Sequence, residues 1–337
     1  KFVNSFTSIV VSAYVLGALL SFLIPHPWPR SFLIMSVMAV LIKSTGMPKK
    51  DAAIIGLAVF AGSASNSMIL LTGDSVLNMV GATAGNVTLT WLEWAKYMAV
   101  PGIVATILTC LVQLWLFKPS QKFEVNKDDI RKELQSLGGL TSVEKRTLFW
   151  VALAVILWAT DSLHGIHPGW IAALMAIGLA LPKVGDVLKP SSWSAVPIGT
   201  LFFLTAAQAI GKVGGVTGMN EWVASVVLPS TIPSNVFVFA AIATAVTMVI
   251  HMVLGSALAV IGIAAPALML FAEAAGINPM VASLLVYTTV SMHFILPFHH
   301  MNVLVGQGDA AGMYGDAETI KLGIPLTVLT FVVTLLV

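Results

Sequence analysis

The chain has 337 residues, of which 58% are hydrophobic and only 9% are charged, and its formal net charge is +2. A soluble domain usually carries about 25% charged residues, and a large apolar core needs a polar surface to cover it. The 17 basic and 15 acidic residues are too few for such a surface. The composition therefore excludes a soluble enzyme, a nucleic-acid-binding module and a disordered chain, and it predicts an all-α polytopic membrane protein.

Long apolar segments follow one another along the whole chain. In order, they lie at about 5–24, 31–42, 52–71, 75–82, 91–117, 148–160, 169–181, 195–211, 217–228, 235–250, 257–272, 280–298 and 321–337. A helix needs about 20 residues to cross a bilayer, so the shorter segments, bounded by Pro and Gly, predict two re-entrant hairpins and two discontinuous helices. The predicted breaks lie at Pro25–Pro29, Gly62–Ser67, Gly73–Ser75, Gly255–Ser256 and Leu296–Asn302. Non-helical backbone inside a membrane needs surrounding protein or a water-filled cavity, so these breaks are the candidate binding site.

The charged residues divide the chain into two membrane halves. The densest run of charge extends from Lys118 to Arg146. It predicts a solvent-exposed loop at 118–147, between a first half at 1–117 and a second half at 148–337. Most Lys and Arg residues fall in the loops 43–50, 118–147, 182–193 and 309–321. Because cytoplasmic loops carry an excess of Lys and Arg, we expect these loops in the cytoplasm and the C-terminus outside.

The two halves resemble each other in the order of their features. Each has a turn with Gly and Pro, a long apolar helix interrupted by polar residues, and a terminal helix that contains proline. Gly46 then corresponds to Gly276, and Pro101 corresponds to Pro325. With the topology above, the copies run in opposite directions across the membrane, which is the inverted repeat of many secondary transporters. The helices at 148–181 lack a counterpart in the first copy, which predicts roughly 80–100 further residues before Lys1.

Several motifs resemble one transporter family. The run from Gly276 through FILPFHHMNVLVGQG to KLGIPLTVLTFVV resembles the last two helices of the divalent anion/sodium symporters, the INDY-type di- and tricarboxylate transporters. TWLEWAKYMAVPGIVATILTCLVQLWLF resembles the helix that ends the family's first repeat, and SNSMILLTG is similar to the subgroup of dicarboxylate and citrate exchangers. The resemblance covers nearly the whole chain. It implies an elevator mechanism, with a scaffold domain and a mobile transport domain, and a homodimer.

In the family that this chain resembles, each of two hairpin tips carries Ser-Asn-Thr, which binds carboxylate and helps to form a sodium site. The first tip here reads Pro25-His26-Pro27-Trp28-Pro29-Arg30-Ser31, and the second reads His251-Met252-Val253-Leu254-Gly255-Ser256-Ala257. Neither tip keeps Ser-Asn-Thr, which lowers the expectation of sodium coupling. Arg30 and the pair His251-Met252 match relatives in the exchanger subgroup.

Arg30 is the charged residue of the first tip. A guanidinium at membrane depth needs an anionic partner, and its planar fork suits a carboxylate. Arg30 and its neighbour Ser31 are therefore candidate substrate-binding residues. The alternative is that Arg30 extends to the membrane interface beside Trp28.

Small polar residues cluster around the first broken helix, where free N–H groups and a helix N-terminus attract anions. The candidate substrate-binding residues there are Asn66, Ser67, Thr72, Gly73, Ser75 and Asn78. Asp74 lies among them, although a carboxylate repels an anionic substrate. It could pair with Arg30, bind a coupling cation, carry a proton or cap a helix.

The second tip and the second broken helix contribute another set of candidate substrate-binding residues, namely Gly255, Ser256, Pro297, His299, His300 and Asn302. Imidazole can donate to a carboxylate and titrates near physiological pH, so His299 and His300 are also candidates for proton coupling. We expect no metal site, because adjacent histidines point to different faces of a helix and no further Cys, His or Asp set stands at ligand spacing. The alternative is a structural role in packing or in hydrogen bonds to the backbone.

The leading hypothesis is a secondary active transporter of di- or tricarboxylates that works by alternating access, as an exchanger or with H⁺ or Na⁺ as the coupling ion. The alternatives are a transporter of an inorganic oxyanion such as sulfate, and a cation/proton antiporter with Asp74 as the titrating group. We expect no enzymatic activity, no cofactor and no nucleic-acid partner. The expected partners are a small anion, the lipid bilayer and a second copy of the chain, in a multi-pass protein of a bacterial inner membrane.

Overall fold

The computed structural model describes residues 5–83, 89–120, 138–195 and 235–337, together with Gln135 and scattered residues between 198 and 226. This described part is helical, and its one extended pairing is an isolated bridge between Gln307 and Tyr314. The predicted apolar segments at 195–211 and 217–228, and much of the predicted loop at 118–147, lie outside the continuously described residues.

The first two helices form a hairpin, in which α1 (Phe6–Leu20) is joined to α2 (Pro27–Thr45) by residues 21–26. Here the predicted break at Pro25–Pro29 is partly wrong, because α2 begins at Pro27. Proline is well tolerated in the first turn of a helix, where its missing N–H has no intrahelical partner. The His26 ring caps this end by accepting a 3.2 Å hydrogen bond from the Trp28 N–H.

The third helical segment is interrupted. Helix α3 (Lys49–Asn66) is followed by a non-helical stretch at 67–74 and then by the short helix α4 (Ser75–Ala82). The break predicted at Gly62–Ser67 is wrong in its start, because the helix continues through Gly62 and ends at Asn66. Gly62 instead makes room for the Tyr14 ring of α1, since a Cβ at Gly62 would lie 2.9 Å from that ring. Every residue from Asp51 to Asn66 is buried.

The same order of elements recurs near the C-terminus. Helices α12 (Val236–Leu254) and α13 (Ala257–Ala274) form a hairpin around Gly255, whose φ of 63° is a left-handed conformation that favours glycine. Helix α14 (Pro279–Met292) then ends, and residues 293–300, which include the 3₁₀ turn η2 (Pro297–His299), separate it from α15 (Met301–Val305). Two proline-containing helices complete the two sets, α5 (Trp91–Leu116) and α16 (Asp316–Thr334), and they pack against each other.

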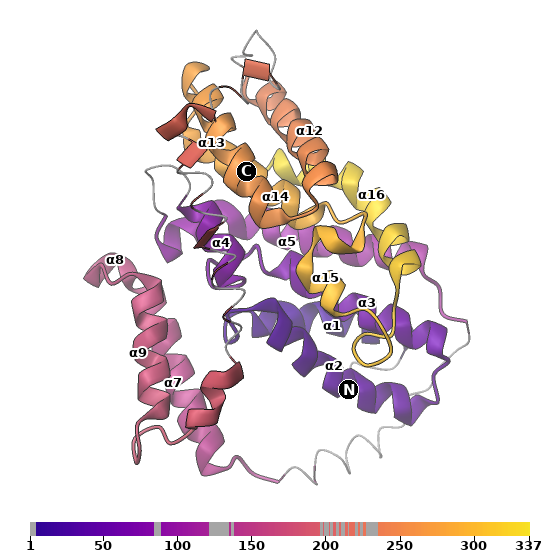
Figure 1. Cartoon of the computed structure of the whole chain (residues 1–337). Helices are drawn as coiled ribbons and strands as arrows, with labels where there is room; N and C mark the ends of the chain where they lie inside the picture. The colour runs from indigo at the N-terminus through magenta and orange to yellow at the C-terminus, as the bar shows by residue number, and fades with distance from the viewer. Residues whose placement is uncertain are drawn as a thin grey trace.

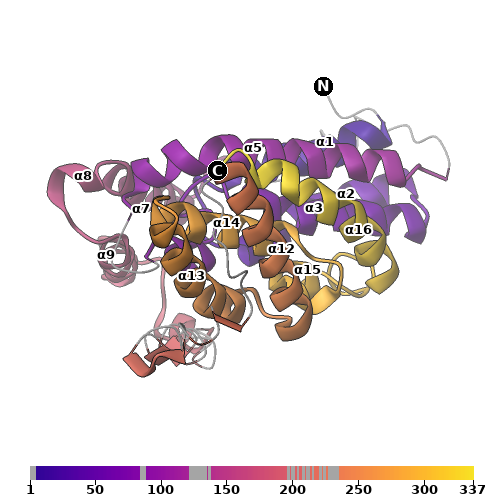
Figure 2. The same cartoon turned by 90° about the horizontal axis from the view of Figure 1, so that it is seen from above.

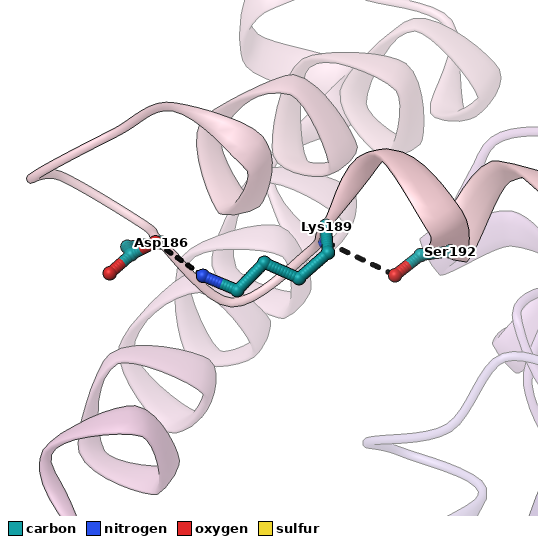
Figure 3. Close-up of polar contacts among 3 residues, drawn as sticks. All are labelled: Asp186, Lys189 and Ser192. Atoms are coloured by element: carbon teal, nitrogen blue, oxygen red, sulfur yellow. Dashed lines mark hydrogen bonds and ion pairs between the residues drawn. The ribbon is translucent and has the colours of Figure 1, made fainter.

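Helices α7 (Ser142–Ala159), α8 (Asp161–His164) and α9 (Pro168–Ala180) lie at one side of the body (Figure 1) and contact its other described helices mainly through α5. Helix α7 begins at Ser142, five residues before the predicted end of the charged loop at 147, because Thr141 and Glu144 form a capping box. After α9 the chain turns into η1 (Pro190–Ala195), where Lys189 pairs with Asp186 at 2.7 Å and bonds Ser192 through its backbone (Figure 3). This pairing lowers the pKa of Asp186 from its ordinary value.

Four described helices, α5, α12, α13 and α16, are long and apolar enough to cross a membrane, and α1, α9 and α14 are shorter apolar helices. Figure 2 shows that α16 lies between α5 and α12, so the two sets of elements are joined along one face. The interrupted helices are the most enclosed part of the body. Every residue from Ala282 to Met292 in α14 is buried, as in α3.

Candidate functional site

The first hairpin tip is docked onto the first break. The Pro25 carbonyl, at the tip, accepts hydrogen bonds from both the Ser75 N–H at 3.1 Å and the Ser75 hydroxyl at 2.8 Å. Ser75 is also the first residue of α4. Its side chain is therefore engaged with the protein, and it sets the position of the tip relative to the broken helix.

Arg30 is completely buried and ties the same two segments together. Its Nη1 donates to the Gly73 carbonyl at 2.9 Å and to the Ile24 carbonyl at 3.2 Å. Its Nη2 donates to the Ser63 carbonyl at 2.8 Å and to the Ser67 hydroxyl at 2.7 Å. Only Nε is left without a partner. The alternative in which Arg30 extends to the membrane interface does not fit this geometry.

Asp74 caps helix α4, which is one of the roles expected from the sequence. Its Oδ1 accepts from the N–H groups of Val76 and Leu77, both at 3.2 Å. A carboxylate is stabilised at a helix N-terminus by the helix dipole and by these otherwise unpaired donors. Within the described residues Asp74 forms no direct ion pair with Arg30, although its charge acts on the nearby guanidinium.

Two candidates of the first break point away from it. Asn66 donates to the Tyr14 carbonyl of α1 at 2.9 Å and accepts from the Thr106 hydroxyl of α5 at 2.9 Å. The Thr72 hydroxyl accepts from the Trp91 indole N–H at 3.0 Å. These side chains join helices, and nothing in their contacts supports the predicted substrate role.

Asn78 holds the break in shape and connects it to the second half of the chain. Its amide nitrogen donates to the carbonyls of Ser67 at 2.7 Å and Leu70 at 2.8 Å. Its amide oxygen accepts from the Tyr287 hydroxyl of α14 at 2.6 Å. Gly73 completes the tight turn, because a Cβ there would collide with the Ser67 carbonyl. Tyr287 was missed in the sequence, where a lone tyrosine in an apolar run carries no signal.

The second hairpin tip is docked onto the second break. A Cβ at Gly255 would lie 2.6 Å from the Phe298 ring, so the tip and η2 are in close contact. The Ser256 hydroxyl caps α13 through a 3.4 Å bond from the Ala259 N–H. The His251 Nε2 lies 3.2 Å from the His299 carbonyl. This second docking resembles the first, in which a tip also meets a broken helix.

The histidines of the second break are buried and incompletely paired. His299 Nε2 and His300 Nδ1 are both buried without a hydrogen-bond partner in the structure. Buried polar atoms are usually satisfied, so these atoms are available to a ligand. Pro297 is the first residue of η2, and its side chain lies outside the part that the structure describes.

The first hairpin meets the second broken helix through Ser31 of α2 and Asn302 of α15. The Ser31 hydroxyl donates to Asn302 Oδ1 at 3.3 Å, and Asn302 Nδ2 donates to the Phe60 carbonyl at 2.6 Å. The structure thus brings Arg30, Ser31 and Asn302 to one region, as the sequence predicts. Unpaired buried atoms there, such as Arg30 Nε and His300 Nδ1, are donors or acceptors suited to a polar ligand.

An all-helical body with membrane-length helices, and with interrupted helices that converge on buried polar groups, defines an integral membrane protein of the transport type. The chain belongs to the family described as the sodium:sulfate symporter transmembrane region, whose pattern matches residues 11–337. It is therefore a member of the divalent anion/sodium symporter family, whose description and relatives' names indicate a transport protein rather than an enzyme. The family resemblance seen in the sequence is confirmed.

Three relatives illustrate this membership. A membrane protein of Cupriavidus necator is 25% identical over 97% of this chain and 66% of its own length. The chloroplastic dicarboxylate transporter 1 of Spinacia oleracea is 26% identical over 54% of this chain and 33% of its own length. The chloroplastic dicarboxylate transporter 2.1 of Arabidopsis thaliana is 27% identical over 50% of this chain and 30% of its own length. The chain thus spans at most about two thirds of these relatives.

Proposed function

We propose that this chain forms the core of a secondary active transporter that carries small di- or tricarboxylates. The observation that carries the proposal is the completely buried Arg30, which lies between the first tip and the first break and has no direct ion pair among the described residues. A buried cation is costly unless it is paired. A substrate carboxylate near its unpaired Nε, the Ser31 hydroxyl and the unpaired His300 Nδ1 would supply that partner. Two relatives named as dicarboxylate transporters support the same substrate class.

The proposed mechanism is alternating access by an elevator movement in a homodimer. The two hairpins, each followed by an interrupted helix and a proline-containing helix, support an inverted repeat, in which such segments surround a central site. Because each tip contacts its own break, a tip and its broken helix would move as one body. We place the protein in a bacterial inner membrane with the loop 118–147 in the cytoplasm, on the distribution of Lys and Arg.

A second candidate substrate is sulfate, because the family description names it. The same description favours Na⁺ as the coupling ion. The alternative of a cation/proton antiporter has less support than transport of either anion, because Asp74, its expected titrating group, caps α4.

Uptake into proteoliposomes tests the proposal. Labelled succinate, citrate and sulfate would be offered with and without a sodium gradient and a pH gradient, and each would be tested in counterflow against internal unlabelled anion. We expect saturable uptake of succinate or citrate. Uptake of sulfate alone would replace the substrate, and transport of none of the three would overturn the proposal.

Variants of Arg30 test the residue that carries the argument. Arg30→Gln should reduce carboxylate transport by at least about tenfold, equivalent to about 1.4 kcal/mol, because it removes the buried positive charge. Lys43→Gln is the matched control, since it removes an exposed positive charge from the same helix. Equal transport by Arg30→Gln and the unmodified protein, at equal reconstitution, would rule out a substrate role for Arg30.

A further inference from the structure

Three histidines from three separate segments meet beneath the second hairpin tip. His251 lies in the last turn of α12, His293 is the C-cap of α14 and His299 ends η2. At most 1% of the surface of each residue is exposed. One ligand nitrogen from each ring can be chosen so that all three lie within 4.8 Å of one another. A cluster of three buried imidazoles is a typical ligand set for a transition metal.

The distances fit coordination. The Nδ1 atoms of His251 and His293 lie 3.2 Å apart. A tetrahedral zinc ion with Zn–N bonds of about 2.0–2.1 Å separates its nitrogen ligands by about 3.3 Å. The rings of His251 and His299 are stacked at 4.7 Å between centroids, and His293 and His299 are stacked at 5.3 Å. The Nδ1 atoms of His251 and His293 therefore already have the required spacing, and a ring nitrogen of His299 lies within 4.8 Å of a ligand nitrogen on each of the other two rings.

The outer contact of His251 orients its ring as a ligand. Its Nε2 lies 3.2 Å from the His299 carbonyl, and a carbonyl can only accept, so Nε2 carries the proton and Nδ1 keeps its lone pair. A metal-binding histidine almost always donates its second ring nitrogen in this way. The lone pair of His251 Nδ1 then accepts a hydrogen bond from His293 Nδ1–H. For both Nδ1 atoms to bind a metal, the proton of His293 must move to its Nε2.

His299 supplies a free nitrogen. Its Nε2 is buried without a partner, which is unfavourable unless a ligand satisfies it. Its Nδ1 lies 3.4 Å from the Leu296 N–H, which is at the weak end of the hydrogen-bond range. Because Nδ1 accepts this bond, Nε2 carries the proton in this structure. Binding of a cation at Nε2 shifts that proton to Nδ1 and gives up only this weak contact.

We propose that His251, His293 and His299 bind one divalent metal ion of the zinc class, which fastens the second hairpin tip to the second break. Imidazole nitrogens suit Zn²⁺, Co²⁺, Ni²⁺ and Cu²⁺, whereas Mg²⁺ and Ca²⁺ prefer oxygen ligands. Three protein ligands leave a fourth position open to water or an anion. The prediction from sequence that no metal site exists considered His299 with its neighbour His300. The fold instead joins His299 to His251, 48 positions away, and His293 to His251, 42 positions away.

Metal analysis tests the site directly. The protein would be purified with a tag free of histidine, treated with a chelator and titrated with ZnCl₂ by calorimetry, with MgCl₂ as the negative control. We expect one zinc ion per chain, a rise in the thermal unfolding temperature with zinc, and no response to magnesium. Binding of no zinc by the folded protein would overturn the proposal.

Single variants distinguish this site from adventitious binding. His251→Gln, His293→Gln and His299→Gln should each weaken zinc binding by at least about tenfold and abolish the thermal shift. His300→Gln is the matched control, because it replaces a buried neighbouring histidine outside the cluster, and it should keep the zinc stoichiometry. Equal loss in His300→Gln would overturn the assignment.

A measurement on the unmodified protein covers the case in which a variant does not fold. Co²⁺ added to the apo protein should give the intense visible absorption bands of tetrahedral nitrogen coordination. A weak octahedral spectrum would count against the site. None of these readouts depends on transport, so the metal site and the proposed substrate can fail separately.

Discussion

Ser31 and Asn302 are 271 positions apart in the sequence, and the Ser31 hydroxyl donates a 3.3 Å hydrogen bond to Asn302 Oδ1. Ser31 lies in the first turns of α2, directly after the first hairpin tip, and Asn302 lies at the start of α15, directly after the second break. This bond joins the two halves of the chain at the level of the candidate site. A double-mutant cycle can therefore measure how strongly the halves are coupled.

The first prediction concerns this coupling. Ser31→Ala and Asn302→Ala should each lower thermal stability in detergent, and the double variant should lose less than the sum of the two. The difference should be about 0.5–1.5 kcal/mol, the usual net contribution of one hydrogen bond. Ser36→Ala, on the exposed face of the same helix, should change little. Strict additivity of the two losses would mean that the contact does not contribute.

The second prediction separates two roles of Asp74, the capping of α4 and the coupling of transport to an ion. Asn is as good a helix cap as Asp, so Asp74→Asn should leave the unfolding temperature nearly unchanged. Asp74→Ala should destabilise the protein by about 0.5–2 kcal/mol, because the N–H groups of Val76 and Leu77 lose their acceptor. Thermal unfolding measures both. A folded Asp74→Asn variant that no longer responds to a sodium or pH gradient would show that the charge itself serves coupling.

The third prediction concerns the 2.6 Å hydrogen bond from the Tyr287 hydroxyl to Asn78. Tyr287→Phe should cost about 1–3 kcal/mol, because it leaves the buried Asn78 oxygen without a donor. Tyr97→Phe is the control, since Tyr97 is 41% exposed. Equal unfolding temperatures for the two variants would contradict a structural role for this bond.

The fourth prediction uses a close approach of the two halves outside the site, between Gly56 and Gly312. A Cβ at Gly56 in α3 would collide with the backbone carbonyl of Gly312. Backbone cannot rotate away as a side chain can, so Gly56→Ala should strongly reduce the yield of folded protein. Gly139→Ala, where a Cβ meets nothing within 4 Å, should express normally. Fluorescence-detected size-exclusion chromatography would compare the two, and an equal monodisperse yield would argue against this packing.

Much of the helical framework could be predicted because its causes are local. Apolar runs and capping residues are read from a few neighbouring positions, so the segments predicted at 75–82 and 91–117 agree with α4 and α5 to within one residue. The errors were also local in origin. The predicted breaks include Gly62 and Pro27. In the structure Gly62 lies inside α3 and makes room for Tyr14, and Pro27 begins α2.

The sequence by itself determined the class of the protein and much of its helical framework, because composition and apolar run length act residue by residue. The family followed from the resemblance of its motifs, such as FILPFHHMNVLVGQG. Only the tertiary structure decided what the polar residues do. It brought the Asn66 side chain into hydrogen bonds with α1 and α5, and it placed four acceptors around the Arg30 guanidinium. It also brought His251, His293 and His299 together beneath one tip. These outcomes depend on which distant segments pack together. The type of a polar residue in the sequence does not indicate which partner it will bond after packing.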